Sequence, residues 1–481
     1  MYEARIRLVA ALLLSFSLVE FLVFGGLGIA IPLIVLIFYS LTLWQGKGIK
    51  KEKISSKLLI PILLVTICFG LFDNQLLKGF NLLLLVGLIL LHIGEVFEIN
   101  PYVPYTIKWF IAILSLGFIK PFEEFGSAIR DAKKEHKEET KGKGEVVNKV
   151  VIGILISLPV VIVAGFLLMR ADAAFEGMMD LITKNVQIDT FYIFTRTITV
   201  ALLFIPCAGF FYGTGSRTSL TGEHDEDKVE RDDVERVRWK LDFTVGLTAC
   251  SLLGGLYIVY CVSQLSYFIS AFSGILPSHF TYAEYARRGF FEMLPIACLN
   301  IGVIGVLNLL VKGKEERKKA IWIRNYSLFF MAFTVFIILT ALSKMALYMG
   351  EYGLTIKRVY VTWFLILCLT SLVLIGISLF RTHFNLVKKL FIAFICLYLG
   401  LNYSNVDYLI ARYNVSLHQA TGAEVESSFQ DLSLSAVGPY MEIQKGEHVD
   451  NDMYKYELEI RSNWENWNLA RYHASQLLKE K

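Results

Sequence analysis

The chain has 481 residues, of which 55% are hydrophobic and 19% are charged, and its mean hydropathy is +0.53. Soluble domains usually carry about 45–50% apolar and about 25% charged residues, so this composition excludes an ordinary soluble protein. The net charge of +4 does not indicate a nucleic-acid partner, because the basic residues lie in short loops between apolar runs. We therefore expect an all-α, polytopic protein whose main partner is the lipid bilayer.

Twelve apolar segments approach the roughly 20 residues that a helix needs to cross the hydrocarbon core. In chain order they cover residues 8–22, 27–44, 58–72, 80–95, 106–119, 150–169, 191–212, 241–269, 290–311, 325–347, 360–380 and 390–403. The first could be a signal peptide, but the second follows almost at once, which favours a retained helical hairpin. Segment 106–119 is short and flanked by prolines, so we interpret it as re-entrant or interfacial. This leaves about eleven spanning helices in a transmembrane domain over residues 1–403.

Lysine and arginine mark the cytoplasmic loops of membrane proteins. Loops 46–57, 120–149, 213–240, 312–324 and 381–389 contain five, eight, six, six and three of them, whereas loops 170–189, 270–288 and 348–358 contain two each. The alternation predicts a cytoplasmic N-terminus and an extracytoplasmic C-terminal tail, residues 404–481, which we expect to be small, soluble and mainly helical. The charged loops 126–146 and 214–237 are expected to be solvated linkers or short helices, with docking of a cytoplasmic protein as the alternative.

Charged groups at the edges of the spans are candidate binding residues, because an ionisable group inside lipid costs about 2.5–3.5 kcal/mol. In the string YAEYARRGFFE, residues 282–292, a helix would bring Glu284, Arg288 and Glu292 onto one face, beside Arg287. Two interpretations stay open. The first is an interfacial ion-pair ladder, and the second is a site for an anion or a lipid headgroup, since arginine pairs bidentately with phosphate and carboxylate.

Further candidates lie beside two other spans, and the loop charges predict the same extracytoplasmic side for all of them, together with Asp172. These candidates are Lys344, Tyr348, Tyr352 and Arg358, and, after the last span, Asp407, Arg412 and Asn414. The Lys344 side chain could instead snorkel outward along its stem. We hypothesise that these groups and the 282–292 string meet in an outward-facing polar pocket covered by the tail. Glu20, inside the first span, has no obvious partner in the sequence.

The sequence assigns no catalytic chemistry, since it has no Walker A loop, no HExxH, no GxSxG and no paired carboxylates at metal-ligand spacing. Its seven cysteines lie in apolar segments without a CxxC motif, which argues against a zinc site or a disulfide framework. We therefore predict no cofactor and no metal ion, and catalytic residues stay unassigned.

Three strings resemble a bacterial multi-pass membrane family of unknown function, domain of unknown function 4173 and the related 4153. They are YAEYARRGFFE at residues 282–292, YGLTIKR at 352–358 and NVDYLIARYN at 405–414. The resemblance implies a location in the bacterial cytoplasmic membrane and no assigned activity. The family's tail carries an aspartate where this chain has Ser435.

Three functions of different classes follow as hypotheses. A non-enzymatic sensor or accessory subunit fits the extracytoplasmic tail and the charged loops. A secondary transporter or channel-like protein fits the number of spans and Glu20, and it predicts a binding site near the bilayer midplane. A membrane enzyme acting on lipid or envelope precursors fits the outer polar groups alone, and it requires a base and an electrophile within hydrogen-bond reach.

Overall fold

The structure, a computed structural model, describes residues 3–45, 57–97, 99–100, 102–139, 190–217, 241–273, 282–309, 311, 316–381, 383–422, 429–443, 452–460 and 463–479. At some helical positions, including 282–294, it describes the backbone alone. The helices are α1 (Glu3–Leu18), the π-helical turn η1 (Val19–Val23), α2 (Ala30–Gln45), α4 (Leu59–Leu71), α5 (Gln75–Val96), α6 (Ile107–Phe118), α7 (Lys120–Glu139), α10 (Thr190–Arg217), α12 (Phe243–Ser273), α13 (Tyr282–Leu309), α14 (Arg317–Tyr352), α15 (Ile356–Ser378), α16 (Leu386–Tyr403), α17 (Val406–Thr421), η3 (Leu434–Ala436), α18 (Val437–Ile443), α19 (Asp452–Ile460), η4 (Trp464–Asn466) and α20 (Leu469–Lys479).

The predicted all-α polytopic fold is confirmed. Seven of the described helices are long and apolar enough to cross a membrane, and four shorter ones are also apolar. Each coincides with one of the twelve predicted segments, while segment 150–169 lies outside the described residues. α6 has 12 residues and rises only about 18 Å, short of the roughly 30 Å hydrocarbon core. The re-entrant interpretation of this segment and the count of eleven spans stay predictions.

The chain divides into two compact units, described separately here. Unit 1 comprises Met1–Leu71, Gln75–Asp225 and Glu459–Leu469, and unit 2 comprises Phe72–Asn74, Glu226–Leu458 and Ala470–Lys481. The predicted boundary at residue 403 concerns membrane embedding rather than compactness, and it stays a prediction.

In unit 1, α1 packs closely on α10. Ala10 and Ala11 of α1 are buried against Ala208 and Phe211 of α10. Small side chains let two helix backbones approach, which replaces the hydrophobic driving force that is missing between helices in lipid. A similarly close approach occurs at Gly209 of α10, where an added Cβ would clash with the main-chain oxygen of Pro121 in the first turn of α7. The N-terminal span is therefore held inside unit 1 by close packing.

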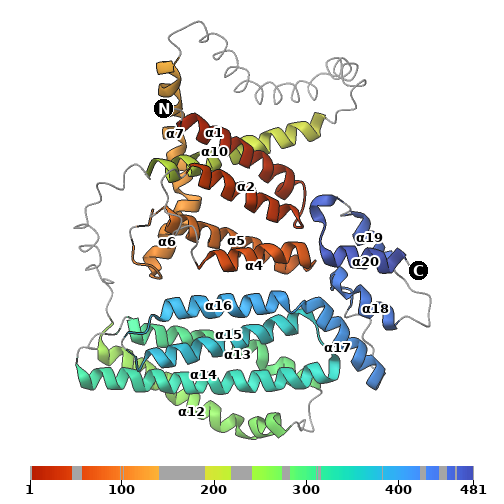
Figure 1. Ribbon diagram of the computed structural model, residues 1–481. Helices are drawn as coiled ribbons and strands as arrows, with labels where there is room; N and C mark the ends of the chain where they lie inside the picture. Colours follow the sequence, from red (N-terminus) through yellow and green to blue (C-terminus); the bar gives the residue numbers. More distant parts are fainter. Residues whose placement is uncertain are drawn as a thin grey trace, which may run out of the picture. The chain divides into compact units, whose positions relative to one another are not determined.

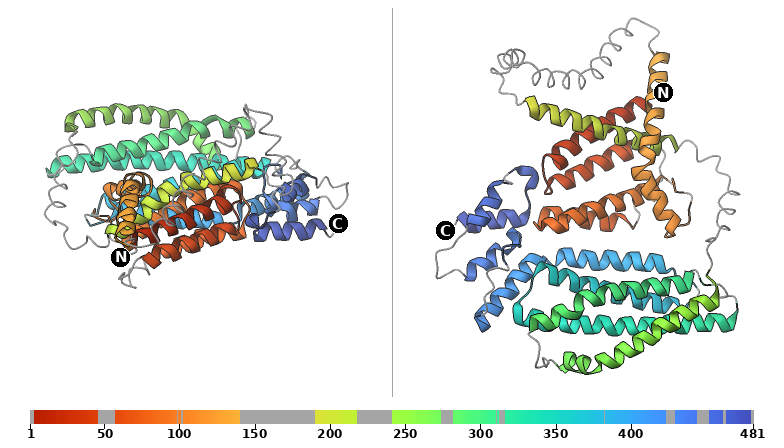
Figure 2. Two further views of the ribbon diagram at one scale, coloured as in Figure 1. Left: turned by 90° about the horizontal axis from the view of Figure 1, so that it is seen from above. Right: turned by 180° about the vertical axis from the view of Figure 1, so that it is seen from behind.

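In unit 2, α12 to α16 run alongside one another, and α17 turns away at one end (Figures 1 and 2). A polar and aromatic contact joins three of them. The rings of Tyr257 in α12 and Phe333 in α14 stack with centroids 4.1 Å apart, and the Tyr257 hydroxyl donates to Asn300 of α13 at 2.6 Å. A buried hydrogen bond between spans removes the cost of leaving either group unpaired in an apolar core.

The outer faces of the spans are apolar. Leu83, Leu252 and Val262 are among the most exposed side chains, at 71%, 74% and 71%. Large contiguous apolar surface is rare on soluble monomers, whereas lipid-facing helices require it. The chain is accordingly a multi-pass membrane protein.

Candidate functional site

The turn between α14 and α15 gathers three of the predicted binding residues. Gly353 ends α14 with φ of +73°, a conformation that L side chains rarely adopt. Arg358 in the first turn of α15 donates to the carbonyl oxygens of Tyr352, at 3.0 Å, and of Gly353. Its guanidinium lies 4.0 Å from the ring centroid of Tyr348, whose ring also contacts Tyr352. Arg358 thus satisfies carbonyls at the end of α14 while it stacks on an aromatic face.

Asn414 of α17 clamps the same turn. Its Oδ1 accepts from the Leu354 backbone N–H at 2.7 Å, and its Nδ2 donates to the Leu354 carbonyl at 2.9 Å. The Asn414 side chain is fully buried, and a Cβ added at Gly353 would lie 2.6 Å from its Oδ1. Asn414 therefore pairs both backbone groups of Leu354 as a neighbouring strand would.

Asp407 lies about two turns before Asn414 on the same buried face of α17. One carboxylate oxygen accepts from Asn74 Nδ2 at 2.8 Å, and the other accepts from the Ser433 backbone N–H at 3.2 Å. Burial raises the pKa of Asp407, the donated hydrogen bonds from Ser433 and Asn74 oppose that rise, and the nearby charge of Asp73 adds to it. The carboxyl is held in a desolvated position that favours its protonated form relative to a carboxyl in water.

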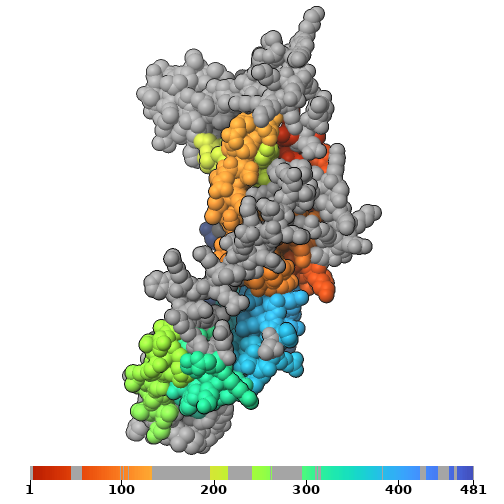
Figure 3. All heavy atoms as spheres, turned by 90° about the vertical axis from the view of Figure 1, so that its left-hand side faces the viewer, coloured from red at the N-terminus to blue at the C-terminus, as the bar shows by residue number. Residues whose placement is uncertain are grey.

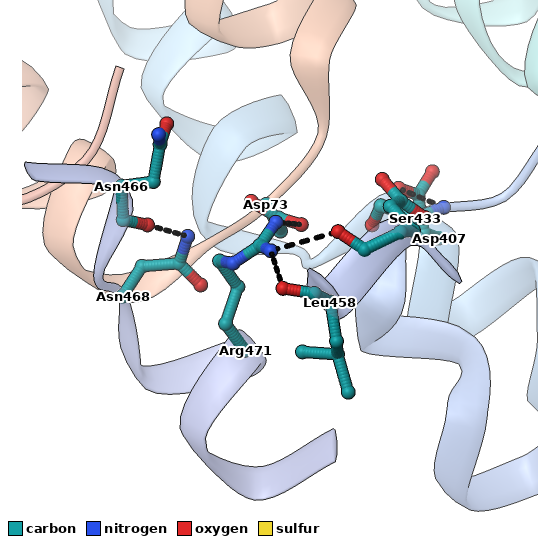
Figure 4. Close-up of polar contacts among 8 residues, drawn as sticks. Asp73, Asp407, Ser433, Leu458, Asn466, Asn468 and Arg471 are labelled. Atoms are coloured by element: carbon teal, nitrogen blue, oxygen red, sulfur yellow. Dashed lines mark hydrogen bonds and ion pairs between the residues drawn. The ribbon is translucent and has the colours of Figure 1, made fainter. Parts of the chain in front are cut away.

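Asp73 and Arg471 form the buried ion pair of unit 2 drawn in Figure 4, with Nη1 and Oδ2 3.4 Å apart. Their side chains are 0% and 6% exposed. Arg471 Nη2 also donates to the carbonyl oxygens of Glu457, at 3.0 Å, and Leu458, at 3.4 Å. One guanidinium therefore compensates a buried carboxylate and satisfies carbonyls near the end of α19.

Arg412 lies on the other side of α17 and forms an exposed ion pair with Glu442 of α18. Exposed pairs of this kind contribute about 0.2–1 kcal/mol. Arg412 thus joins two helices of the tail and does not enter the buried cluster formed by Asp407 and Asn414.

The structure brings together two of the groups predicted to meet, those from the α14–α15 turn and from α17. Lys344 is 6% exposed, so it does not extend to the surface along its stem. The string 282–292 is helical within α13, as predicted. The side chains of Glu284, Arg287, Arg288 and Glu292 lie outside the described residues, as does Asp172, so their membership in a common pocket stays a prediction.

Four residues of the cluster were not predicted from the sequence: Asp73, Asn74, Ser433 and Arg471. Asp73 and Asn74 form a polar dipeptide between two apolar segments, which is a weak pattern, because most loops between spans are polar. Their partners lie 398 and 333 residues further along the chain, and no local spacing relates them.

Unit 1 supplies the partner that Glu20 lacked in the sequence. Glu20 lies in the π-helical turn η1 and forms an ion pair with Arg196 of α10. The Arg196 guanidinium lies 5.0 Å from the centroid of the Phe24 ring. π-Helical turns inside helices occur frequently at functional sites, and ionisable residues within spans commonly line pathways.

Comparison with known protein families gives a match over most of the chain. A family model described as "Domain of unknown function (DUF4153)" matches residues 59–443, which includes most spans and α17. No curated protein and no solved structure matches the chain.

Proposed function

The chain belongs to the DUF4153 family, and we propose that it serves in the bacterial cytoplasmic membrane as a non-enzymatic sensor or accessory subunit with a docked extracytoplasmic tail. Similarity to domain of unknown function 4173 rests on the three quoted strings and is part of the same proposal. The observation that carries the proposal is that the polar side chains of the α14–α15 turn and of the buried face of α17 make their hydrogen bonds within the protein.

An enzyme site needs a base and an electrophile that are free to meet a substrate. In unit 2, both oxygens of Asp407 accept hydrogen bonds from the protein, and both polar atoms of the Asn414 amide bond to Leu354. Arg358 is likewise directed at backbone carbonyls. These groups fasten the tail and the α14–α15 turn to each other, which supports attachment rather than catalysis as their role.

Contacts of the tail agree with the predicted alternation of the loops. Leu354 lies in loop 348–358, for which the charge distribution predicts the outside, and Asn74 lies one predicted span after the cytoplasmic loop 46–57. Both bond to the tail, through Asn414 and Asp407 respectively. The tail therefore meets only loops of its own predicted side in these contacts.

Contacts at the opposite predicted side agree with this arrangement. In unit 1, the Tyr212 hydroxyl donates to Asp131; Asp131 lies in loop 120–149 and Tyr212 borders loop 213–240, and both loops are predicted to be cytoplasmic. In unit 2, the Arg324 guanidinium lies 5.3 Å from the ring centroid of Phe380, and both again border such loops. A wrong alternation of the loops would pair residues of opposite predicted sides, whereas exchanging inside and outside would leave these pairings unchanged.

Orientation is tested by labelling intact cells with a membrane-impermeant maleimide, in a variant whose native cysteines are replaced. A cysteine at Tyr456, which is exposed in the tail, is expected to react. A cysteine at Glu316, exposed beside α14 on the predicted cytoplasmic side, is expected to react only after lysis. The reverse pattern would overturn the proposed orientation.

The accessory role is tested by photo-crosslinking in native membranes. A photoreactive phenylalanine at Tyr456, whose side chain is 67% exposed, is expected to give one discrete adduct with another membrane or envelope protein. The same residue at Tyr454, which is 1% exposed, serves as the matched control and is expected to give none. Absence of any adduct from the exposed position, together with enzymatic turnover by the purified chain alone, would contradict the proposal.

Transport is a second candidate function because of the Glu20–Arg196 pair within the spans of unit 1. A transporter that uses this pair should drive solute or proton flux into proteoliposomes, and Glu20→Gln should abolish the flux without unfolding the protein. If vesicles that contain the folded wild-type chain show no more solute or proton flux than empty vesicles, this alternative is wrong.

A further inference from the structure

A hollow of about 340 Å³ opens at the end of unit 2 where α12 and α14 begin. Its lining residues are Phe243, Thr244, Leu247, Thr248, Ser251, Trp322 and Tyr326. Figure 3 shows this end of unit 2, with light-green atoms of α12 beside the teal atoms of the α13–α14 region. The hollow is remote along the helices from the α14–α15 turn, so it is separate from the tail-docking cluster.

The hollow is lined by apolar side chains and by the polar groups of Thr244, Thr248, Ser251, Trp322 and Tyr326, here called its rim. Thr248 and Ser251 donate to backbone carbonyls of their own helix, and Ser251 lies 2.5 Å from the Tyr326 hydroxyl. Among the described residues, the Thr244 hydroxyl and the Trp322 indole N–H have no such commitment, which leaves two donors at the rim for a phosphate or ester oxygen. Tryptophan suits the headgroup region of a bilayer, because its ring is apolar and its N–H is polar.

The rim carries a net positive charge. Arg317, Lys318 and Lys319 follow one another at the start of α14, and the Lys319 ammonium lies 5.8 Å from the centroid of the Phe243 ring. Two carboxylates oppose them: Glu316, which accepts from Lys319 at 2.6 Å, and Asp242, which caps the Thr244 backbone N–H at 2.8 Å. Among the residues that the structure describes here, three cations against two carboxylates leave a surplus beside the hollow, which favours an anionic occupant.

An apolar stripe continues from the hollow along α12. Thr248, Leu252, Leu256 and Val259 are spaced three or four residues apart, so they share one face of the helix. The last three are 74%, 63% and 67% exposed. A molecule with a polar headgroup in the hollow could therefore lay a hydrocarbon chain along this apolar stripe. A free phosphate ion has no such chain and would not use the stripe.

We propose that this hollow binds one anionic phospholipid, with the headgroup phosphate at Lys319, Thr244 and Trp322 and an acyl chain along the exposed face of α12. The occupant is a bilayer lipid of the leaflet in which α12 and α14 begin. This inference is independent of the proposed function, because it uses none of the residues that fasten the tail.

The test uses the full-length chain in phosphatidylcholine nanodiscs that contain increasing fractions of phosphatidylglycerol with brominated acyl chains. Bromine quenches nearby tryptophan, and subtraction of the Trp322→Phe variant isolates the contribution of Trp322. Half-quenching is expected at a several-fold lower fraction of brominated phosphatidylglycerol than of brominated phosphatidylcholine. Equal fractions would overturn the proposal.

Paired variants test the two halves of the site. Lys319→Glu reverses the charge and Thr248→Phe fills the hollow, and each is expected to abolish the preference for phosphatidylglycerol. Their controls, Lys357→Glu at the other end of unit 2 and the lipid-facing Val373→Phe, are expected to retain it. Retention of the preference in either test variant would refute the site.

One further arm distinguishes a lipid from a free headgroup. Glycerol 1-phosphate added in large excess over the lipid is expected to leave the quenching by brominated phosphatidylglycerol unchanged, because it lacks the chain that lies on α12. Displacement of the lipid by glycerol 1-phosphate would overturn the assignment to a phospholipid.

Discussion

Breaking the buried Asp73–Arg471 pair is expected to release the end of the tail. Arg471→Met keeps most of the side-chain volume but leaves the Asp73 carboxylate buried without a counter-charge. It also removes the donors to the carbonyls of Glu457 and Leu458. Loss of one partner from a buried ion pair costs about 3–5 kcal/mol, because the remaining charge is desolvated and uncompensated.

The assay follows the reactivity of a cysteine at Ala474, which is 2% exposed and belongs to the small core of the tail. Its labelling by a maleimide requires local opening, so the labelling rate reports the opening equilibrium. A cost of about 3 kcal/mol corresponds to a rate increase of roughly a hundredfold. Asp73→Asn in the Arg471→Met background removes the stranded charge and is expected to recover most of the protection.

Arg412→Met is the matched control, because it breaks an arginine–carboxylate pair of the same tail whose side chains are 54% and 44% exposed. An exposed pair contributes about 0.2–1 kcal/mol, so the labelling rate should rise less than about fivefold. If Arg471→Met and Arg412→Met accelerate labelling equally, or if Asp73→Asn gives no recovery, burial does not determine the strength of the pair and the reasoning is refuted.

Three further predictions concern other polar and close contacts. Burial raises the pKa of Asp407 above its ordinary 3.8, so the folded chain binds this proton more tightly than the unfolded chain. The free energy of unfolding should therefore fall as pH rises from about 4 through the raised pKa. Asp407→Asn should flatten that slope in pH-dependent melting, and an unchanged slope would exclude this carboxyl as its source. Gly28→Ala inserts a Cβ 2.5 Å from the main chain of the η4 turn and should lower the free energy of unfolding by about 1–3 kcal/mol. Gly87→Ala, whose added Cβ meets open space, should not lower the unfolding temperature. Equal effects of the two variants would contradict the contact. Reversal of Glu20 or Arg196 alone should lower the unfolding temperature and reversal of both should restore most of it, whereas a double variant no more stable than the singles would argue against a direct pair.

The spans could be predicted from the sequence because the bilayer imposes a simple rule on each segment by itself. A helix in hydrocarbon satisfies its own backbone and must be apolar outside, so a run such as residues 360–380 is recognised without knowledge of its neighbours. The predicted helices therefore match the observed ones wherever the structure describes them. The position of Tyr348, Tyr352 and Arg358 at the end of a span was likewise a local inference, and the structure places them around the α14–α15 turn.

The partners within the cluster could not be predicted, because the interactions that matter there are between segments far apart in the chain. Lys344 illustrates the limit: its stem could reach an interface, and only the packing of unit 2 around α14 decides that it is buried instead. Glu20 gives the same lesson in unit 1, since its partner lies 176 residues later.

Arg471 shows why the tail cannot be treated as an appendage to the spans. Alone in the sequence it is one of several basic residues in an acidic tail, and its role arises when α20 approaches Asp73, the residue between α4 and α5. The desolvation of that aspartate is tolerable only while the guanidinium is present. Asp407 follows the same logic, because its oxygens are satisfied by Asn74 and by the backbone of Ser433 together. Burial of these carboxylates is therefore coupled to folding of the tail, and a chain that lacks the tail should leave Asp73 without its counter-charge.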